Sequence, residues 1–218
     1  TNLADILPTI IILGNHDCNL NNSYRLDALS PIVNAINHKN IHYLKDNGIY
    51  EVQGVHFNVM GVDEKPINYI NAADFDGEYK IALHHGSVHN ASTDAGFTLS
   101  NTHVTTDIFR GHDITLLGDI HKPQYLDDNK TIAYAGSLIQ QNHGEVLGHG
   151  IMVWDLKTKK SEIVEIKNDY GYYTYEIDNG EILNPNPNVP KKPRLRFKVK
   201  DTDSGTLKQI IADVKSKY

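Results

Sequence analysis

Three short segments rich in metal-ligand side chains each follow directly after an apolar, strand-like run. The segments are Gly14-Asn15-His16-Asp17, His84-His85-Gly86 and Gly118-Asp119-Ile120-His121. The runs that precede them are Ile10–Leu13, Ile81–Leu83 and Ile114–Leu117. In open α/β folds, ligands bind beyond the carboxyl ends of the strands. The sequence therefore predicts an α/β fold in which three strands deliver polar side chains to one site.

The composition is that of an ordinary globular protein. The 218 residues are 39% hydrophobic and 22% charged, which suits one domain or one and a fraction. The sequence has no apolar stretch long enough to span a membrane and no signal-peptide pattern. The single cysteine, Cys18, excludes an internal disulfide framework and fits a reducing compartment. We therefore expect an intracellular location (cytoplasm, nucleoid, nucleus or viral factory, depending on the host) and no membrane partner.

The charge balance bears on nucleic-acid binding. The formal net charge is −6, whereas proteins that bind DNA mainly through their own phosphate contacts are usually basic. The balance therefore does not favour strong autonomous DNA binding. It does not exclude a nuclease, because metal ions supply much of the positive charge in such a site.

The chain is predicted to begin as an α/β pattern and to become β-only after the third segment. Apolar residues between Leu26 and Ile36 recur at helical spacing, and Pro31 must begin or interrupt that helix. Gln53-Gly54 favours a hairpin turn, and a short helix is expected near Thr105–Phe109. The predicted strands span residues 9–13, 49–52, 55–60, 80–83, 114–117, 124–126, 131–134, 151–156, 161–166 and 172–177.

The C-terminal part predicts a domain boundary. Residues 178–193 form a stiff segment rich in Pro and Asn, which is typical of a linker. In residues 194–200 apolar and basic side chains alternate strictly, and an apolar helical stripe follows from Leu207 to Val214. Since one strand and one helix cannot bury a core, we expect a main domain over residues 1–177, a linker over 178–193, and the beginning of a second domain over 194–218.

The ligand types in the three segments suit hydrolysis of a phosphate ester by two divalent metal ions. Two ions about 3.5–4 Å apart clamp the phosphate and lower the pKa of a bound water. Asn15 can offer a carbonyl oxygen to a metal, His16 can protonate a leaving alkoxide, and Asp17 can orient His16. Asp119 and His121 are two residues apart at a strand end and point the same way. Taken singly, each segment is also explained by an ordinary polar turn; the interpretation depends on all three occurring in order.

These motifs resemble those of the calcineurin-like metallophosphoesterases. Within that family the similarity is closest to the SbcD and MRE-eleven group of DNA double-strand-break repair nuclease subunits, which includes recombination endonuclease subunits of phages and large viruses. The resemblance covers roughly residues 8–177 and depends on Gly14–Asp17, Gly118–Gln124 and Tyr134–Glu145. It implies a sandwich of two mixed β-sheets flanked by helices, and it makes residues 194–218 the start of a small α+β capping domain.

The resemblance also implies cofactors, partners and individual roles. Two divalent ions are expected, with Mn²⁺ favoured and Fe, Zn or Mg as alternatives, and the expected partners are DNA, an SMC-type ATPase and a second copy of the chain. The implied metal ligands are Asn15, His84, Asp119 and His121. The implied catalytic residues are His16 and Asp17. Substrate contacts are expected from His85, Gly136, Ser137 and His143.

Two departures from the family pattern matter. Asp119 stands where the family usually has His, and its harder oxygen ligand favours Mn²⁺ or Mg²⁺ or else weakens the site. The family's first two motifs, Asp-x-His and Gly-Asp-x-x-Asp, precede Gly-Asn-His-Asp and are not in this sequence. We therefore expect this chain alone to be inactive or nearly so, and its longer parent to be active.

Three functions stay open on the sequence. The favoured one is a metal-dependent DNA nuclease, exonuclease or endonuclease, in break repair or recombination. A phosphodiesterase or phosphatase acting on a small substrate is the first alternative, although the Tyr134–Glu145 stretch and the second domain argue against it. A catalytically inactive scaffold that recruits the ATPase is the second, and Asp119 and the missing motifs support it.

Overall fold

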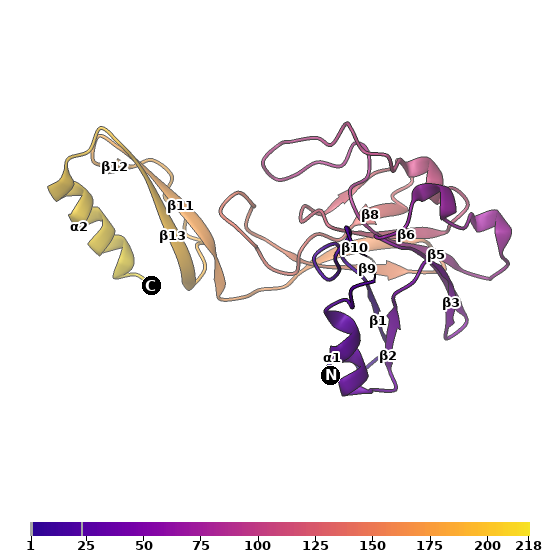
Figure 1. Cartoon of the computed structure of the whole chain (residues 1–218). Coiled ribbons are helices and arrows are strands. Elements are labelled where there is room, and N and C mark those ends of the chain that lie inside the picture. The colour runs from indigo at the N-terminus through magenta and orange to yellow at the C-terminus, as the bar shows by residue number, and fades with distance from the viewer. Residues whose placement is uncertain (1, 23) are drawn as a thin grey trace. The chain divides into compact units, whose positions relative to one another are not determined.

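The computed structural model describes residues 2–22 and 24–218 and separates into two compact units. The first unit comprises residues 1–136 and 152–163, and the second comprises residues 137–151 and 164–218. Both contain mixed parallel and antiparallel pairing, so the predicted α/β class with mixed sheets is confirmed (Figure 1). Neither α-helix in the described residues has the length and apolar character needed to cross a bilayer.

The largest element of the first unit is a six-stranded sheet with the strand order β3-β4-β5-β6-β8-β7. Its strands are β3 (Gly48–Val52), β4 (Val55–Met60), β5 (Lys80–His85), β6 (Ile114–Gly118), β7 (Gln124–Tyr125) and β8 (Ile132–Tyr134). The four central strands are parallel, and β3 and β7 pair antiparallel at the two edges. The predicted β3–β4 hairpin is confirmed: Gln53 and Gly54 have φ of 53° and 78°, the left-handed geometry that tight hairpin turns require.

A second, two-stranded sheet packs near the first. Strands β1 (Thr9–Ile12) and β2 (Ile41–Leu44) pair in parallel and are connected through helix α1 (Leu29–Ile36), in which Pro31 lies in the first turn as predicted. The apolar side chains of β1 pack with Leu83 and Leu116 of the large sheet. The Asn15 loop at the end of β1 therefore lies beside the ends of β5 and β6.

The large sheet has a hydrophobic core on each face. One core contains Val59, Ile81 and Leu83 and faces β1 and β2. The other contains Ala82 and Leu117 and is covered by apolar residues of the connection from 86 to 112, including Phe109 of η3 (Thr106–Phe109). Because successive side chains of a strand point to opposite faces, His85 lies on the β1 side and His84 on the other.

The remaining elements of the first unit are short. Two single-turn helices, η1 (Pro66–Asn68) and η2 (Ala72–Asp74), follow β4. Strands β9 (Gly150–Asp155) and β10 (Lys160–Glu165) form a two-stranded sheet where strands were predicted, and residues 152–163 of this hairpin belong to the first unit. Its turn region is held by an ion pair of 2.6 Å between Lys159 and Asp113.

The second unit contains a three-stranded sheet and a helix: β11 (Tyr170–Asp178), β12 (Glu181–Ile182), β13 (Lys192–Lys200) and α2 (Ser204–Lys215). Figure 1 shows α2 lying along this sheet, and Tyr175, Ile177 and Val214 are buried. Residues 179–191, which make up most of the predicted linker 178–193, connect β11 to β13, and these two strands pair in parallel. Parallel strands need a crossover of a dozen or more residues, and the Pro- and Asn-rich segment supplies that length.

Candidate active site

The structure brings three of the predicted site residues together at the ends of three strands. Asn15 follows β1, His85 ends β5, and Asp119 follows β6. The Nε2 atom of His85 lies 3.2 Å from Oδ1 of Asn15, and Nδ2 of Asn15 lies 3.5 Å from a carboxylate oxygen of Asp119. Since that amide nitrogen donates to Asp119, the amide oxygen accepts from His85. The predicted convergence of the three segments is therefore present between these side chains.

The Gly14–Asp17 loop is held in a tight conformation. The Gly14 amide donates to Oδ2 of Asp17 at 2.9 Å, and the Ala28 amide donates to the Asp17 carbonyl oxygen at 2.8 Å. A Cβ at Gly14 would lie 2.9 Å from Asp17 Oδ2 and 3.2 Å from the His85 ring. Glycine therefore allows the close approach of His85, and the Asp17 carboxylate fixes the loop that carries His16.

His84, predicted as a metal ligand, lies on the other face of β5. It is buried, with its ring centroid 5.8 Å from that of Tyr69 and 6.1 Å from that of Phe109. Its Nδ1 atom donates to the Met60 carbonyl oxygen at 3.0 Å, which leaves Nε2 with a lone pair. Histidines that bind metals are commonly oriented by such a bond from the second ring nitrogen. Burial lowers the pKa of His84, and the hydrogen bond to Met60 opposes it, so the ring is neutral near pH 7.

The pKa of His85 is shifted by burial and by ionisable groups that lie near its ring. Burial is the largest cause of its lowered pKa, and an apolar groove of about 400 Å³ between β1 and the large sheet ends at His85 and Gly118. The negative charges of Asp119 and Asp17 oppose this lowering. The neighbouring imidazoles of His16 and His121 add to it. All three sequence segments therefore contribute to the electrostatic field at His85.

Asp119 has an unusual backbone conformation for a residue with a side chain. Its φ of 98° is a region that glycine adopts freely and L side chains rarely adopt. Such strain is concentrated at functional sites, where the surrounding structure holds it. The Ser87 hydroxyl donates to Asp119 Oδ2 at 3.0 Å. Sequence reasoning did not select Ser87; its position directly after His-His-Gly was the available signal.

Two residues of the Tyr134–Glu145 stretch support the strand-end loops. The Tyr134 hydroxyl donates to the Gly86 carbonyl oxygen at 2.6 Å and accepts from the Val88 amide at 3.0 Å, in a fully buried position. Gly136 has a φ of 79°, and a Cβ there would lie 2.7 Å from the His121 carbonyl oxygen. The structure thus places Gly136, predicted as a substrate contact, directly behind the loop that carries His121.

The Tyr134→Phe substitution is expected to lower the free energy of unfolding by about 1–3 kcal/mol, because the buried Val88 amide and Gly86 carbonyl lose their partner. Urea denaturation of the 218-residue chain measures this change. Tyr170→Phe is the matched control, since the Tyr170 side chain is 62% exposed and its loss of a hydroxyl should change stability by less than about 0.5 kcal/mol. Equal losses in the two variants would contradict the bracing role of Tyr134.

The other two predicted substrate contacts belong to the second unit. The Ser137 hydroxyl lies 3.0 Å from Nδ1 of His149, and Nε2 of His149 lies 3.0 Å from the Val146 carbonyl oxygen. His143 packs edge-on against Tyr172, with 5.0 Å between the ring centroids, and its Nδ1 lies 3.3 Å from the Thr174 hydroxyl. In the second unit, Ser137 therefore fixes a loop and His143 lies on the face of the β11–β13 sheet.

The donor types of the site fit a divalent cation. Asn15 supplies an amide oxygen and Asp119 a carboxylate at the convergent strand ends, and His84, on the other face of β5, has an imidazole nitrogen with a lone pair; these donor types suit Mn²⁺, Fe or Zn. Across residues 2–22 and 24–218, no three His, Cys, Asp or Glu side chains come close enough together to hold a metal ion.

The chain matches no family model. It is similar to an uncharacterized protein of Acanthamoeba polyphaga mimivirus, with 43% identity over 226 residues. The aligned region covers 99% of this chain and 17% of the mimivirus protein. The chain thus spans about one sixth of the length of that relative.

Proposed function

We propose that this chain is part of a calcineurin-like metallophosphoesterase that hydrolyses phosphodiester bonds, and that the whole protein is a DNA nuclease subunit in double-strand-break repair or recombination. The observation that carries the proposal is the contact of Asn15 with both His85 and Asp119 at the carboxyl ends of β1, β5 and β6. Packing of the β1–β2 sheet against the large sheet supports the proposed sandwich. An SMC-type ATPase is the proposed partner.

The proposed roles follow from the contacts of each side chain. Asn15, His84 and Asp119 would hold one ion and His121 the other; when bound, the two ions supply positive charge for the phosphoryl oxygens and lower the pKa of a water. The Ser87 hydroxyl holds the Asp119 carboxylate in place. His16 would donate a proton to the leaving oxygen, and Asp17 fixes its loop.

The test uses the longest natural polypeptide that contains these residues and, beside it, the 218-residue chain alone. With Mn²⁺ present, we expect the longer protein to cleave end-labelled duplex DNA in preference to a chromogenic phosphodiester, and the short chain to show little activity. His16→Ala should lower cleavage by about 100-fold, the low end of what a general acid contributes. His103→Ala, which changes an exposed histidine of a loop, should leave it unchanged. Turnover of the small ester alone would overturn the nuclease assignment.

An inactive scaffold that recruits the ATPase is the second candidate. It is favoured by Asp119, which stands where the resembling family usually has His. On this alternative the longer protein binds the ATPase but cleaves neither substrate at any divalent metal concentration. The same pair of assays, with a pull-down of the ATPase, therefore separates the two candidates.

A further inference from the structure

One face of the β11–β13 sheet carries a regular series of aromatic and basic side chains. The parallel register places Tyr170 beside Lys192, Tyr172 beside Arg194 and Thr174 beside Arg196. These six residues are called the tyrosine–cation ladder below. Their side chains share one face because every second residue of a strand points the same way.

In each cross-strand pair of the ladder, the two side chains contact each other directly. The Lys192 ammonium lies 5.2 Å from the Tyr170 ring centroid, and the Arg194 guanidinium lies 5.5 Å from that of Tyr172. Arg194 also donates to the Tyr172 hydroxyl at 3.1 Å, and Arg196 donates to the Thr174 hydroxyl at 3.0 Å. The cations are therefore held in place by neutral groups, and their charge is not cancelled by these contacts.

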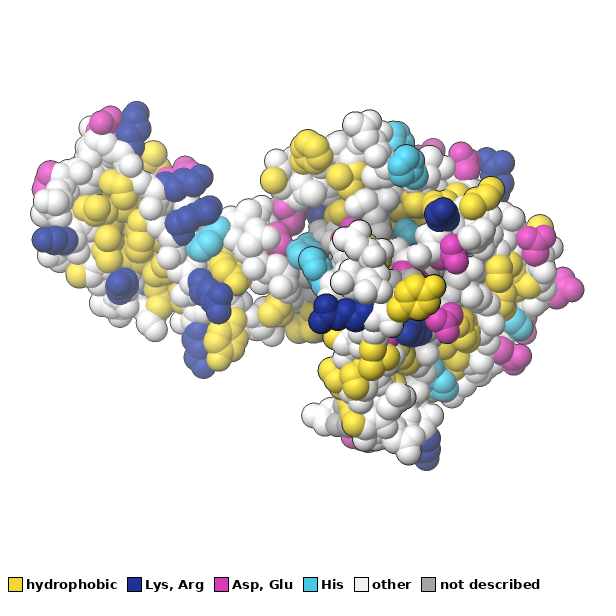
Figure 2. Space-filling view, viewed as in Figure 1, with side chains coloured by type: hydrophobic (Ala, Val, Ile, Leu, Met, Phe, Trp, Pro, Cys, Tyr) yellow, Lys and Arg dark blue, Asp and Glu magenta, His cyan; other side chains and the backbone are white. Residues whose placement is uncertain are grey.

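The positive charge is concentrated at one end of β13. Further along the strand, Lys198 pairs with Glu176 at 3.8 Å and Lys200 with Asp178 at 3.4 Å. For the three cations of the ladder, no acidic partner is found among the described residues. Figure 2 shows Lys and Arg side chains gathered on this unit, although the chain as a whole carries a formal charge of −6. An anionic partner would complement this local charge.

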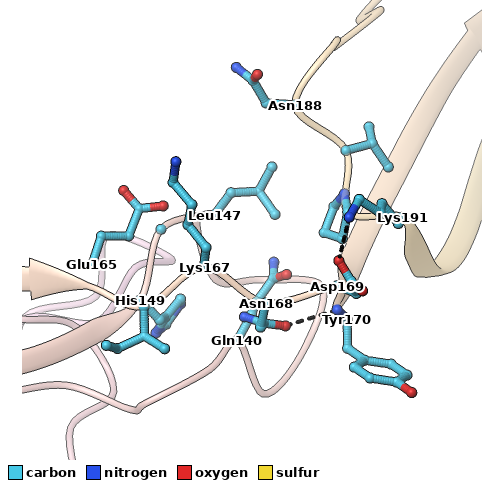
Figure 3. A pocket seen from close by; sticks show the side chains of 14 residues that line it. Gln140, Leu147, His149, Glu165, Lys167, Asn168, Asp169, Tyr170, Asn188 and Lys191 are labelled. Carbon is cyan, nitrogen blue, oxygen red and sulfur yellow. Dashed lines mark hydrogen bonds and ion pairs between the residues drawn. The ribbon is translucent and has the colours of Figure 1, made fainter.

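The ladder face is partly accessible and has hollows at both ends. Tyr170 is 62% exposed, and Arg194 and Arg196 are exposed, whereas Tyr172 is half-buried with the His143 ring packed edge-on against it. A hollow of about 440 Å³ lies beside Arg196, and its lining includes the amides of Asn184 and Asn186 as well as the carboxylates of Glu145 and Glu176. A second hollow, of about 630 Å³, has Gln140, Lys167, Asn168, Tyr170, Asn188 and Lys191 in its lining, together with Glu165 and with Asp169, which pairs with Lys191 (Figure 3). Amide groups of this kind can hydrogen-bond the edges of unpaired bases.

We propose that the tyrosine–cation ladder binds a single strand of nucleic acid. Bases stack on the tyrosine rings and the Arg194 guanidinium plane, and phosphates contact the three cations; this combination is the usual basis of single-strand binding. Alternate residues of a strand are about 6.6–6.8 Å apart, so the cations repeat at a spacing that an extended sugar–phosphate chain can follow. A duplex keeps its base faces stacked internally, so it cannot use the rings. The inference is independent of the proposed cleavage reaction.

The first test measures binding of the 218-residue chain in EDTA, which prevents metal-dependent cleavage. The probe is a fluorescein-labelled oligo-dT of about 20 nucleotides, longer than a typical single site, and a duplex of equal length is the comparison. Arg194→Gln with Arg196→Gln should weaken oligo-dT binding about 10-fold or more. The slope of log affinity against log salt should fall by about 1.4, since each lost phosphate contact removes about 0.7. The matched control, Lys198→Gln with Lys200→Gln, removes two charges from the same strand and should change affinity less than about 3-fold.

The second test separates stacking from charge. Tyr172→Ala should weaken binding about 5- to 100-fold, whereas Tyr172→Phe keeps the ring and should stay within about 3-fold of the parent. Thermal melting of each variant checks that the fold is kept. Absence of oligo-dT binding, equal binding of the duplex, or equal losses in the two double variants would each overturn the proposal.

Discussion

Replacing Asp27 by alanine is expected to lower the free energy of unfolding at pH 7 by about 3–5 kcal/mol. Asp27 is only 3% exposed, and it accepts hydrogen bonds from the Ser30 amide at 2.7 Å and the Tyr43 hydroxyl at 2.9 Å. Its carboxylate also pairs with Lys45 at 2.9 Å. Because the Lys45 side chain is 36% exposed, the loss comes chiefly from the buried hydrogen-bond donors around Asp27, which are left without an acceptor. The Gly14–Asp17 loop should loosen as well, because the amide of Ala28 holds Asp17.

The effect of Asp27 should depend on pH. Burial alone would raise the pKa of Asp27, but hydrogen bonds from Ser30, Lys45 and Tyr43 outweigh burial and lower it well below its usual range. Its contribution is therefore fully present above the unfolded-state pKa of about 3.9 and is lost as the pH falls toward the folded-state value. Urea denaturation at pH 7, 5 and 3 should show the difference between parent and variant shrinking only below about pH 4.

The matched control for this prediction is Asp128→Ala, which removes an exposed carboxylate from a turn of the same unit. Its effect should stay within about 0.5 kcal/mol at every pH. If Asp27→Ala were no more destabilising than this control, or if its effect grew as the pH fell, the assigned role of the buried carboxylate would be wrong.

Asp119→Gly is expected to separate stability from activity. Glycine adopts a φ of 98° without strain, so the substitution should relieve about 1–3 kcal/mol of backbone strain. This gain should offset the loss of the hydrogen bond from Ser87. The free energy of unfolding should therefore be unchanged or higher by up to about 1 kcal/mol. Cleavage by the longer natural protein should fall by about 100-fold or more, since even residues that only support a metal ligand are worth about 10- to 100-fold.

The control for Asp119 is Asp119→Asn, which keeps the side-chain shape and an oxygen acceptor but removes the charge. We expect its stability to lie near that of the parent and its activity to fall as well. A large loss of stability in Asp119→Gly would mean that the residue is held there for packing. Full activity in both variants would remove Asp119 from the proposed metal site.

Local sequence patterns correctly predicted those strands and turns that are determined by interactions between residues close in the sequence. Gln53-Gly54 predicted the β3–β4 hairpin, and the apolar runs predicted β1, β5 and β6. The strand β2 was missed because its four residues, Ile41–Leu44, are stabilised by parallel pairing with β1 rather than by a local turn. The pairing of β11 with β13 was missed for the same reason, since it joins strands separated by a segment typical of a linker.

The sequence predicted which segments meet at the candidate site, but it did not predict which side chains contact one another there. The strand-end positions of Asn15, His85 and Asp119 followed from the apolar runs. Which of His84 and His85 meets Asn15 depends on the face that each presents, and that requires the packing of β1 against the large sheet. The strained backbone of Asp119 has no signal in the sequence, because the residue type alone predicts an ordinary conformation.

The position of β13 has a consequence for how the protein behaves in solution. It is an edge strand of its sheet within the described residues, and a free edge of nine residues is a template for pairing with another copy. Its basic side chains would bring like charges together in such a pair, so repulsion keeps copies apart at low ionic strength. At about 1 M salt the screening length falls to about 3 Å and this protection is lost. Concentrated stocks should therefore remain dispersed in dilute buffer and self-associate in strong salt.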